Sequence, residues 1–358
     1  MPARIIGFDL ARGYAIWGMF IVNFNLAFGN HEDPSLVGRF LALFNGNSST
    51  TFVMLAGMGV ALMSARPNYR PEERRRLRRV VLKRAAFLLV LGMLLSAWWP
   101  ADILRCYGLY LALAAPLMFA ARRWFLVAAG AAIIGFHALM LVIPYETGWD
   151  FHTLHYADFW TPAGWLRHNL YNGFNPVFPW LAFFMTGMYL GRLDWAVPTT
   201  RRRVLLLGLL VYVPVAALQL LADLLPLPAG LHYVLRADYL PPLLPFVLST
   251  TGFGMALIAA FMAVGIRVGG HPAVARLAAT GQMTLTHYVS HLILGMGLLA
   301  WLSGRPYAGT SSSPAPVSPP AVLLFATGYL VLSYLVSGLW RRRFPHGPLE
   351  SLMRRLSR

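Results

Sequence analysis

The sequence has little of what a soluble protein needs. Its one cysteine, Cys106, lies in an apolar run, so an internal disulfide is excluded and the thiol is interpreted as a packing residue. Charged residues make up 12% of the 358 positions and hydrophobic residues 58%, which excludes an ordinary soluble domain. No Walker loop or Rossmann fingerprint is present, so ATP hydrolysis and pyridine-nucleotide binding in a soluble fold are not expected.

Acidic residues are especially few, 13 against 30 lysines and arginines, which gives a formal net charge of +17. The basic residues gather in short clusters between apolar runs, at 66–84, 122–123, 201–203 and 341–343. The preference of basic residues for the cytoplasmic side of a membrane explains such clusters, so we expect no nucleic-acid partner. With the amino terminus inside, 25 of the 30 basic residues face the cytoplasm. Both termini are therefore predicted to be cytoplasmic.

Ten apolar runs approach the roughly 17–25 residues that a helix needs to cross a bilayer. They are predicted at 11–29, 48–65, 81–98, 103–121, 124–143, 174–191, 204–225, 242–266, 281–302 and 321–340. The runs do not alternate apolar with polar residues, which excludes a β-barrel. The predicted fold class is therefore an all-α polytopic membrane protein, a bundle of about ten transmembrane helices.

We expect one transmembrane domain over residues 1–358. Its parts are a front half at 1–143, an outer loop at 144–173, a second half at 174–340 and a cytoplasmic basic tail at 341–358. The outer loop is rich in tryptophan, histidine and acids, and is interpreted either as an interfacial aromatic belt or as a lid over an outward-facing site. The tail resembles a short amphipathic element for an anionic membrane surface, so membrane lipids are expected partners.

The first apolar run carries polar residues along its length. Asp9 and His31 are 22 residues apart, which spans about 33 Å in a helix and matches the bilayer core. Asn23 follows Arg12 by 11 residues, close to three turns, so the two project from nearly the same side. Asn25 lies about 200° away from Asn23 and is interpreted as helix-packing glue. The pattern favours a path through the membrane, although for each polar residue a packing or surface role is the simpler interpretation.

Other candidate residues lie further along the chain. His287 and His291 are four apart on one helical face, but without a third ligand they favour hydrogen-bonded packing or substrate contact over a metal, and no metal is expected. Arg105 begins an outer helix and could form a local ion pair or bind an anionic substrate. Arg84 ends a basic run that could bind lipid phosphates or the phosphates of a nucleotide.

Several segments resemble the YeiB-like family of bacterial membrane proteins, and the likeness extends over the whole chain. The front half is similar to the transmembrane acyltransferases typified by heparan-α-glucosaminide N-acetyltransferase. The segments that carry the resemblance are RIIGFDLARGYAIWGMFIVN, TFVMLAGMGVAL, DILRCYGLYLALAAPL, GQMTLTHYVSHL and RRRFPHGPLESLMRR.

This resemblance implies a function and assigns roles to residues. The acyltransferases transfer an acetyl group from cytosolic acetyl-CoA to an acceptor on the far side of the membrane, which implies acyl-CoA as donor substrate here. Asp9 and Arg12 match the D-x-x-RG motif near the cofactor's inner mouth, and Asn23 matches the F-V-N segment. His31 matches the catalytic histidine, and His291 the histidine of a late Y-V-x-H helix. A bacterial cytoplasmic (inner) membrane location is also implied.

Three function classes stay open on the sequence. The first is an acyltransferase that modifies an extracytoplasmic glycan, lipid or small molecule. The second is a secondary transporter or exporter, for which ten spans and buried polar residues are equally natural. The third is a non-catalytic scaffold or sensor, which leaves the alignment of Arg12 with Asn23 without a use. The oligomeric state is also open, and a homodimer is one option.

Overall fold

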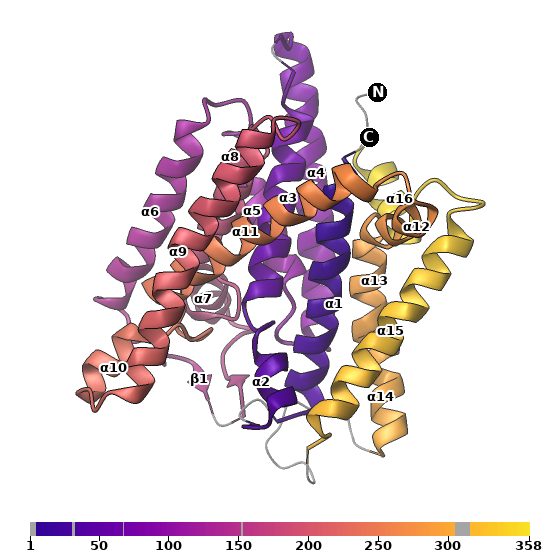
Figure 1. The fold of residues 1–358 in the computed structure, drawn as a ribbon. Coiled ribbons are helices and arrows are strands. Elements are labelled where there is room, and N and C mark those ends of the chain that lie inside the picture. The colour runs from indigo at the N-terminus through magenta and orange to yellow at the C-terminus, as the bar shows by residue number, and fades with distance from the viewer. Residues whose placement is uncertain (1–4, 31–32, 67, 152, 305–315) are drawn as a thin grey trace. The chain divides into compact units, whose positions relative to one another are not determined.

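The computed structural model describes residues 5–30, 33–66, 68–151, 153–304 and 316–358. The regular structure of these residues is helical apart from one two-stranded hairpin (Figure 1). They divide into two compact units, one made of 1–52, 152–154 and 257–352, and the other of 53–151, 155–256 and 353–358. The division falls within α3 (Asn47–Met63) and α11 (Leu244–Val268), so each of these helices contributes to both units.

The first unit is built around α1. Within this unit α1 packs against α12, α13 and α15, as Figure 1 also shows. Its elements are α1 (Ile6–Phe28), α2 (Leu36–Ala42), α12 (Pro272–Gly281), α13 (Thr284–Ser290), the π-helix η2 (His291–Gly295), α14 (Met296–Ser303), α15 (Pro319–Trp340) and most of α16 (Pro348–Leu356). The helix Thr284–Ser303 thus continues through a π-helical turn.

Small residues allow α1 to approach its neighbours closely. A Cβ atom at Gly281 would lie 1.8 Å from the backbone oxygen of Asp9, so α12 meets α1 backbone to backbone. At the start of α1, a Cβ atom on Gly265 of α11 would lie 2.5 Å from the backbone nitrogen of Gly7. Close packing of this kind is typical of helices in membranes, where the hydrophobic effect does not drive helices together. Small residues there let the backbones approach closely enough for van der Waals packing.

The second unit holds the remaining helices and the hairpin. Within it, α4 packs on α5 and α6 packs on α8. Its elements are α4 (Pro71–Ser96), α5 (Leu104–Ala114), α6 (Arg123–Met140), β1 (Trp149–Asp150), β2 (His155–Tyr156), α7 (Pro162–Arg167), the π-helix η1 (His168–Asn172), α8 (Val177–Leu190), α9 (Pro198–Leu224) and α10 (Ala229–Leu235). In the antiparallel hairpin, Trp149 pairs with Tyr156 and Asp150 with His155.

A helix lies at each of the ten predicted spans, and several apolar helices indicate a multi-pass membrane protein. Among the described residues, five helices are long and apolar enough to cross a membrane on their own: 123–140, 198–224, 244–268, 284–303 and 319–340. The number of ten spans, the cytoplasmic termini and the predicted domain boundaries stay predictions.

The structure corrects two predicted helix boundaries. The helix predicted at 103–121 ends at Ala114, because Pro116 has no N–H and disfavours helix in the preceding residue. At 11 residues, α5 spans about 16 Å. The helix predicted at 81–98 begins at Pro71 instead, where Pro71 occupies the first turn and the Glu73 side chain accepts a hydrogen bond from the Arg70 backbone nitrogen at 2.9 Å.

The outer loop predicted at 144–173 is a folded element. It contains the hairpin, α7 and η1, and it buries polar side chains as well as aromatic ones. Folding of the segment does not test the aromatic-belt interpretation, which stays a prediction. The lid interpretation stays a prediction.

Candidate functional site

Asp9 and Arg12 lie together at the start of α1. The Asp9 carboxylate is buried, and its Oδ1 atom lies 3.5 Å from Nη1 of Arg12. Gln282, at the end of α12, donates a hydrogen bond from Nε2 to Oδ2 of Asp9 at 3.2 Å. The ion pair is thus fixed between two helices of the first unit, with the Arg12 side chain partly exposed.

Further along α1, Asn23 contacts a histidine 268 residues away in the sequence. Its Nδ2 atom lies 2.9 Å from Nε2 of His291, and both residues are buried. An amide nitrogen can only donate, so Nε2 accepts and the proton of the neutral ring lies on Nδ1. His291 is the first residue of η2, and π-helical turns are frequent at functional sites.

Aromatic rings surround His291. The ring centroids of Phe20, Tyr288 and Phe24 lie 4.9, 5.1 and 5.9 Å from that of the imidazole. Nδ1 of His291 is buried, and the ring also faces the backbone carbonyls of Tyr288 and His287. The imidazole is therefore held in place by Asn23 and by a shell of aromatic rings.

The second histidine of the pair has a different partner. Nε2 of His287 lies 2.6 Å from Oγ of Ser337 on α15, and both side chains are buried. His287 and His291 therefore hydrogen-bond to different helices rather than to one shared ion. The residues that the structure describes contain no group of three or more His, Cys, Asp or Glu that could hold a metal.

A residue that sequence reasoning did not single out holds the helix of these histidines. Oε1 of Glu350, on α16, accepts from the backbone nitrogens of Leu285 and Thr286 at 2.9 and 3.1 Å, and Oε2 accepts from the Thr286 hydroxyl at 2.5 Å. A carboxylate there satisfies the first amides of α13 and complements the positive end of the helix. The sequence signal for Glu350 is the GPLE segment, one of the segments that resemble the YeiB-like family.

Arg105 lies in the second unit and is fully buried. Its Nε atom donates to Oδ1 of Asn169 at 3.0 Å, and Nη1 donates to Oγ of Ser96 at 2.7 Å and to the Pro100 carbonyl at 3.1 Å. Nη2 lies 3.2 Å from Nδ1 of His168, which accepts because arginine has no lone pair to offer. These neutral acceptors fix the guanidinium between α4 and η1.

His168 is kept neutral by its surroundings. Burial, followed by the positive charges of Arg105 and Arg167, holds the pKa of His168 well below its ordinary value. The neutral ring is the form that can accept from Arg105, so geometry and charge agree.

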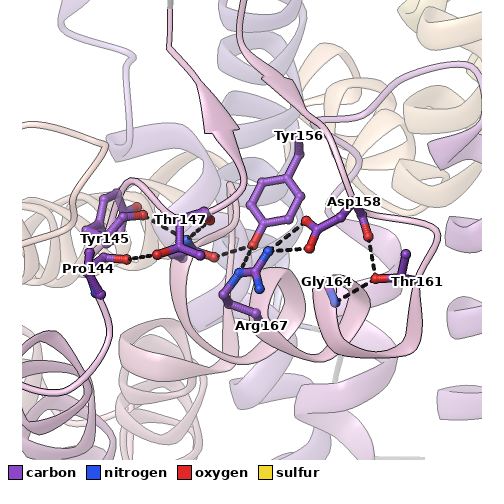
Figure 2. Close-up of polar contacts among 9 residues, drawn as sticks. Pro144, Tyr145, Thr147, Tyr156, Asp158, Thr161, Gly164 and Arg167 are labelled. Atoms are coloured by element: carbon purple, nitrogen blue, oxygen red, sulfur yellow. Dashed lines mark hydrogen bonds and ion pairs between the residues drawn. The ribbon is translucent and has the colours of Figure 1, made fainter.

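Arg167 ties the folded outer segment together, as Figure 2 shows. Its Nη2 atom lies 2.6 Å from both carboxylate oxygens of Asp158, and its Nε atom donates to the Tyr156 hydroxyl at 2.7 Å. That hydroxyl donates to Oδ1 of Asn172 at 2.7 Å, and Nδ2 of Asn172 donates to the Thr147 carbonyl at 2.8 Å. One chain of contacts therefore links the hairpin, α7 and η1.

Two predicted site residues remain to be placed. Arg84, on α4 in the second unit, contacts Oγ of Ser357 and the sulfur of Met63, both at 3.4 Å. His31 lies outside the described residues. The structure thus places Asp9, Arg12 and the Asn23–His291 pair in the first unit together with His287, and Arg84 and Arg105 in the second.

Residues 4–219, more than half of the chain, match the family described as Heparan-alpha-glucosaminide N-acetyltransferase, catalytic. The chain belongs to this acetyltransferase family. Residues 185–358 match a second family, described as Protein of unknown function (DUF418). The resemblance to the YeiB-like proteins and to the transmembrane acyltransferases is thereby confirmed. A comparison with curated proteins found no match.

The two matched regions meet at the Asn23–His291 contact. Asn23 falls within the region of the acetyltransferase family, whereas His291 and its capping residue Glu350 fall within the second region. The part of the chain beyond the acetyltransferase match therefore supplies a partner to a buried polar residue of that match.

Proposed function

We propose that the protein is a membrane-embedded acyltransferase that moves an acyl group, acetyl in the first instance, from cytoplasmic acyl-CoA to an extracytoplasmic hydroxyl or amine. The single observation that carries the proposal is the buried contact between Asn23 and His291 in a chain of an N-acetyltransferase family. A glycan, a lipid or a small molecule could provide the acceptor. The bacterial inner membrane is the proposed location.

Asn23 is assigned to stabilise the charge that forms during transfer. One N–H of its amide donates to Nε2 of His291, which fixes the direction of the amide plane. The other N–H is the donor that we assign to the carbonyl oxygen of the acyl group as it becomes negative. Loss of one such donor costs about 10²–10³ in rate in other enzymes of acyl transfer.

His31 is assigned as the group that takes the proton. As the acceptor oxygen or nitrogen attacks the thioester carbon, the new bond forms and the acceptor proton passes to the imidazole. Collapse of the intermediate breaks the carbon–sulfur bond, and the CoA thiolate leaves and is protonated. A variant in which His31 briefly carries the acyl group gives the same products in two steps.

The remaining predicted residues are assigned to binding. Asp9, Arg12 and Arg84 are proposed to contact the donor on the cytoplasmic side. His287, His291 and Arg105 are proposed to contact substrate. Three neutral side chains engage Arg105 and would hold its guanidinium in position for that contact.

Purified protein in detergent, incubated with acetyl-CoA and longer acyl-CoAs, tests the proposal. CoA release that falls by at least about tenfold in N23A and in H31A supports the assigned roles, whereas full activity in H31A removes that residue from both mechanistic variants. Arg343→Gln provides a charge-altering control on an exposed residue outside the proposed machinery. Substrate flux across proteoliposomes without CoA release would instead support the transporter class.

A further inference from the structure

A basic groove lies on the first unit, and neither Asn23 nor His291 lines it. Its volume is about 450 Å³, and it is lined by α12, by α15 and by the residues that follow α15. Three arginines line it, namely Arg276 on α12 and Arg341 and Arg342 directly after α15. None of the described residues that line it is acidic. The volume falls within the roughly 300–1,000 Å³ of small-molecule sites, and the charge favours an anion.

The arginines are suited to phosphate. A guanidinium presents its N–H donors in a planar fork that matches phosphate oxygens two at a time. Neither the Arg276 side chain nor the Arg342 side chain makes a hydrogen bond or an ion pair with another residue that the structure describes. A preference for the cytoplasmic side explains basic residues after a span, but it does not explain why a groove should join arginines from two separate helices.

The groove also offers a flat surface and open space. Tyr334 contributes an aromatic ring to the lining, and Gly338 contributes no side chain at all. A Cβ atom at Gly338 would meet no other atom within 4 Å, so this glycine is not required for helix packing. Aromatic rings with cations beside them are the combination that binds a nucleobase and its phosphates.

Gln282 connects the groove to the start of α1. It lines the groove, and its Nε2 atom donates to Oδ2 of Asp9, the partner of Arg12. Its Oε1 atom is buried and has no hydrogen-bond partner among the described residues. An acceptor of this kind, at the rim of a basic groove, is placed to receive an N–H group from a bound molecule.

We infer that this groove binds the nucleotide end of the acyl-CoA donor, with its phosphates on Arg276, Arg341 and Arg342 and its adenine near Tyr334. The inference rests on the proposed function, and it assigns the nucleotide site to the second matched region, at 185–358. An anionic lipid headgroup shares the phosphate but lacks the flat base, so the two sources are separated by experiment.

The binding test uses the full chain in detergent and adenosine 3′,5′-bisphosphate as the probe, with calorimetry as the measurement. Arg276→Gln, Arg342→Gln and Gly338→Leu should each weaken binding by about tenfold or more, because they remove a phosphate donor or fill the groove. Arg343→Gln is the matched charge control, since Arg343 is adjacent but does not line the groove. Gly328→Leu is the matched size control, because Gly328 lies on the same helix and also faces open space.

Gly338→Ala guards against a folding artefact. Alanine is favoured over glycine within a helix, so this variant should unfold no earlier than the parent while it narrows the groove. Weaker binding of the bisphosphate by a variant at least as stable as the parent supports the site. Equal binding by parent, Arg276→Gln and Arg342→Gln overturns it.

Kinetics separate this inference from the proposed function. In the groove variants the KM for acetyl-CoA should rise with kcat unchanged, while transfer from S-acetylpantetheine, which has no nucleotide, should be unaffected. If the groove variants use acetyl-CoA with the same KM as the parent, the groove assignment is wrong and the proposed acyltransferase activity is unaffected. If the bisphosphate binds through the arginines but no acyl group is ever transferred, the nucleotide site is supported and the proposed acyltransferase activity is wrong. If phosphatidylglycerol vesicles bind through these arginines and the bisphosphate does not, the groove holds lipid and the assignment is wrong.

Discussion

Replacing Glu350 with alanine should loosen the helix that carries both membrane histidines. The carboxylate accepts two backbone N–H groups and one hydroxyl, from Leu285 and Thr286, and Met283 offers α13 no side-chain cap of its own. A hydrogen bond to a charged group contributes about 1.5–3 kcal/mol. Because Glu350 is only half-buried and water can replace part of the loss, we expect the free energy of unfolding to fall by about 2–4 kcal/mol.

Glu350→Gln separates charge from geometry. The amide keeps one oxygen for the backbone donors but loses the charge at the helix terminus and the acceptor for the Thr286 hydroxyl, so it should cost about 1 kcal/mol. Hydrogen exchange gives the local measurement, since the amides of Leu285 and Thr286 should exchange faster in the order parent, Gln, Ala. Acyl transfer should fall in the same order. Glu146→Ala, at an exposed residue in the other unit, is the control for the loss of a carboxylate.

The order of the three proteins is the decisive result. Unchanged exchange at Leu285 and Thr286 in Glu350→Ala would show that the contact does not hold α13. Faster exchange spread evenly over both units would show a general loss of stability instead of a lost cap.

Other substitutions test the packing and the titration of the two units. Gly281→Ala places a Cβ 1.8 Å from the Asp9 carbonyl and should lower the unfolding midpoint, at a cost of about 1–3 kcal/mol; an unchanged midpoint would refute the close approach. Ser337→Ala should lower the free energy of unfolding by about 1–3 kcal/mol through the lost 2.6 Å contact with His287. Replacing Ser337 and His287 together should cost less than the sum of the two single substitutions. Because the pKa of His168 is lowered in the folded protein, the unfolded chain takes up a proton at this residue at a higher pH than the folded chain does. The contribution of His168 to stability is therefore complete above about pH 6.5 and declines as the pH falls below that value. His168→Gln should flatten that decline in unfolding measured between about pH 5 and 7, and equal slopes would contradict the assignment.

Helix positions were predictable from the sequence because each long apolar run has one solution in lipid. The residues at which the helices begin and end were less predictable, for reasons that lie in the local sequence. Pro116 gave a stop signal within a run that hydropathy alone extends to residue 121, and α5 ends before it. Basic residues after Pro71 reduce hydropathy but are good helix formers, so α4 begins well before its apolar part.

The sequence indicated candidate site residues one at a time, but not the contacts between them. Polar residues within apolar runs pointed to Asn23 and His291 separately, whereas periodicity carries no information about contact between residues 268 apart. Glu350 gave no hydropathy signal, because its role depends on the amides of a distant helix. The tie between Arg167, Asp158 and Tyr156 was likewise hidden in a segment whose composition is typical of a membrane interface.

The capping of α13 by Glu350 has a consequence for biosynthesis. The ribosome makes Leu285 and Thr286 about sixty residues before it makes the carboxylate that they bind. Until Glu350 has been translated, these amides lack their carboxylate acceptor, and α13 reaches its final state only after α15 and α16 have been made. A nascent chain halted between these points would carry every residue of the acetyltransferase match and still lack the carboxylate that caps α13.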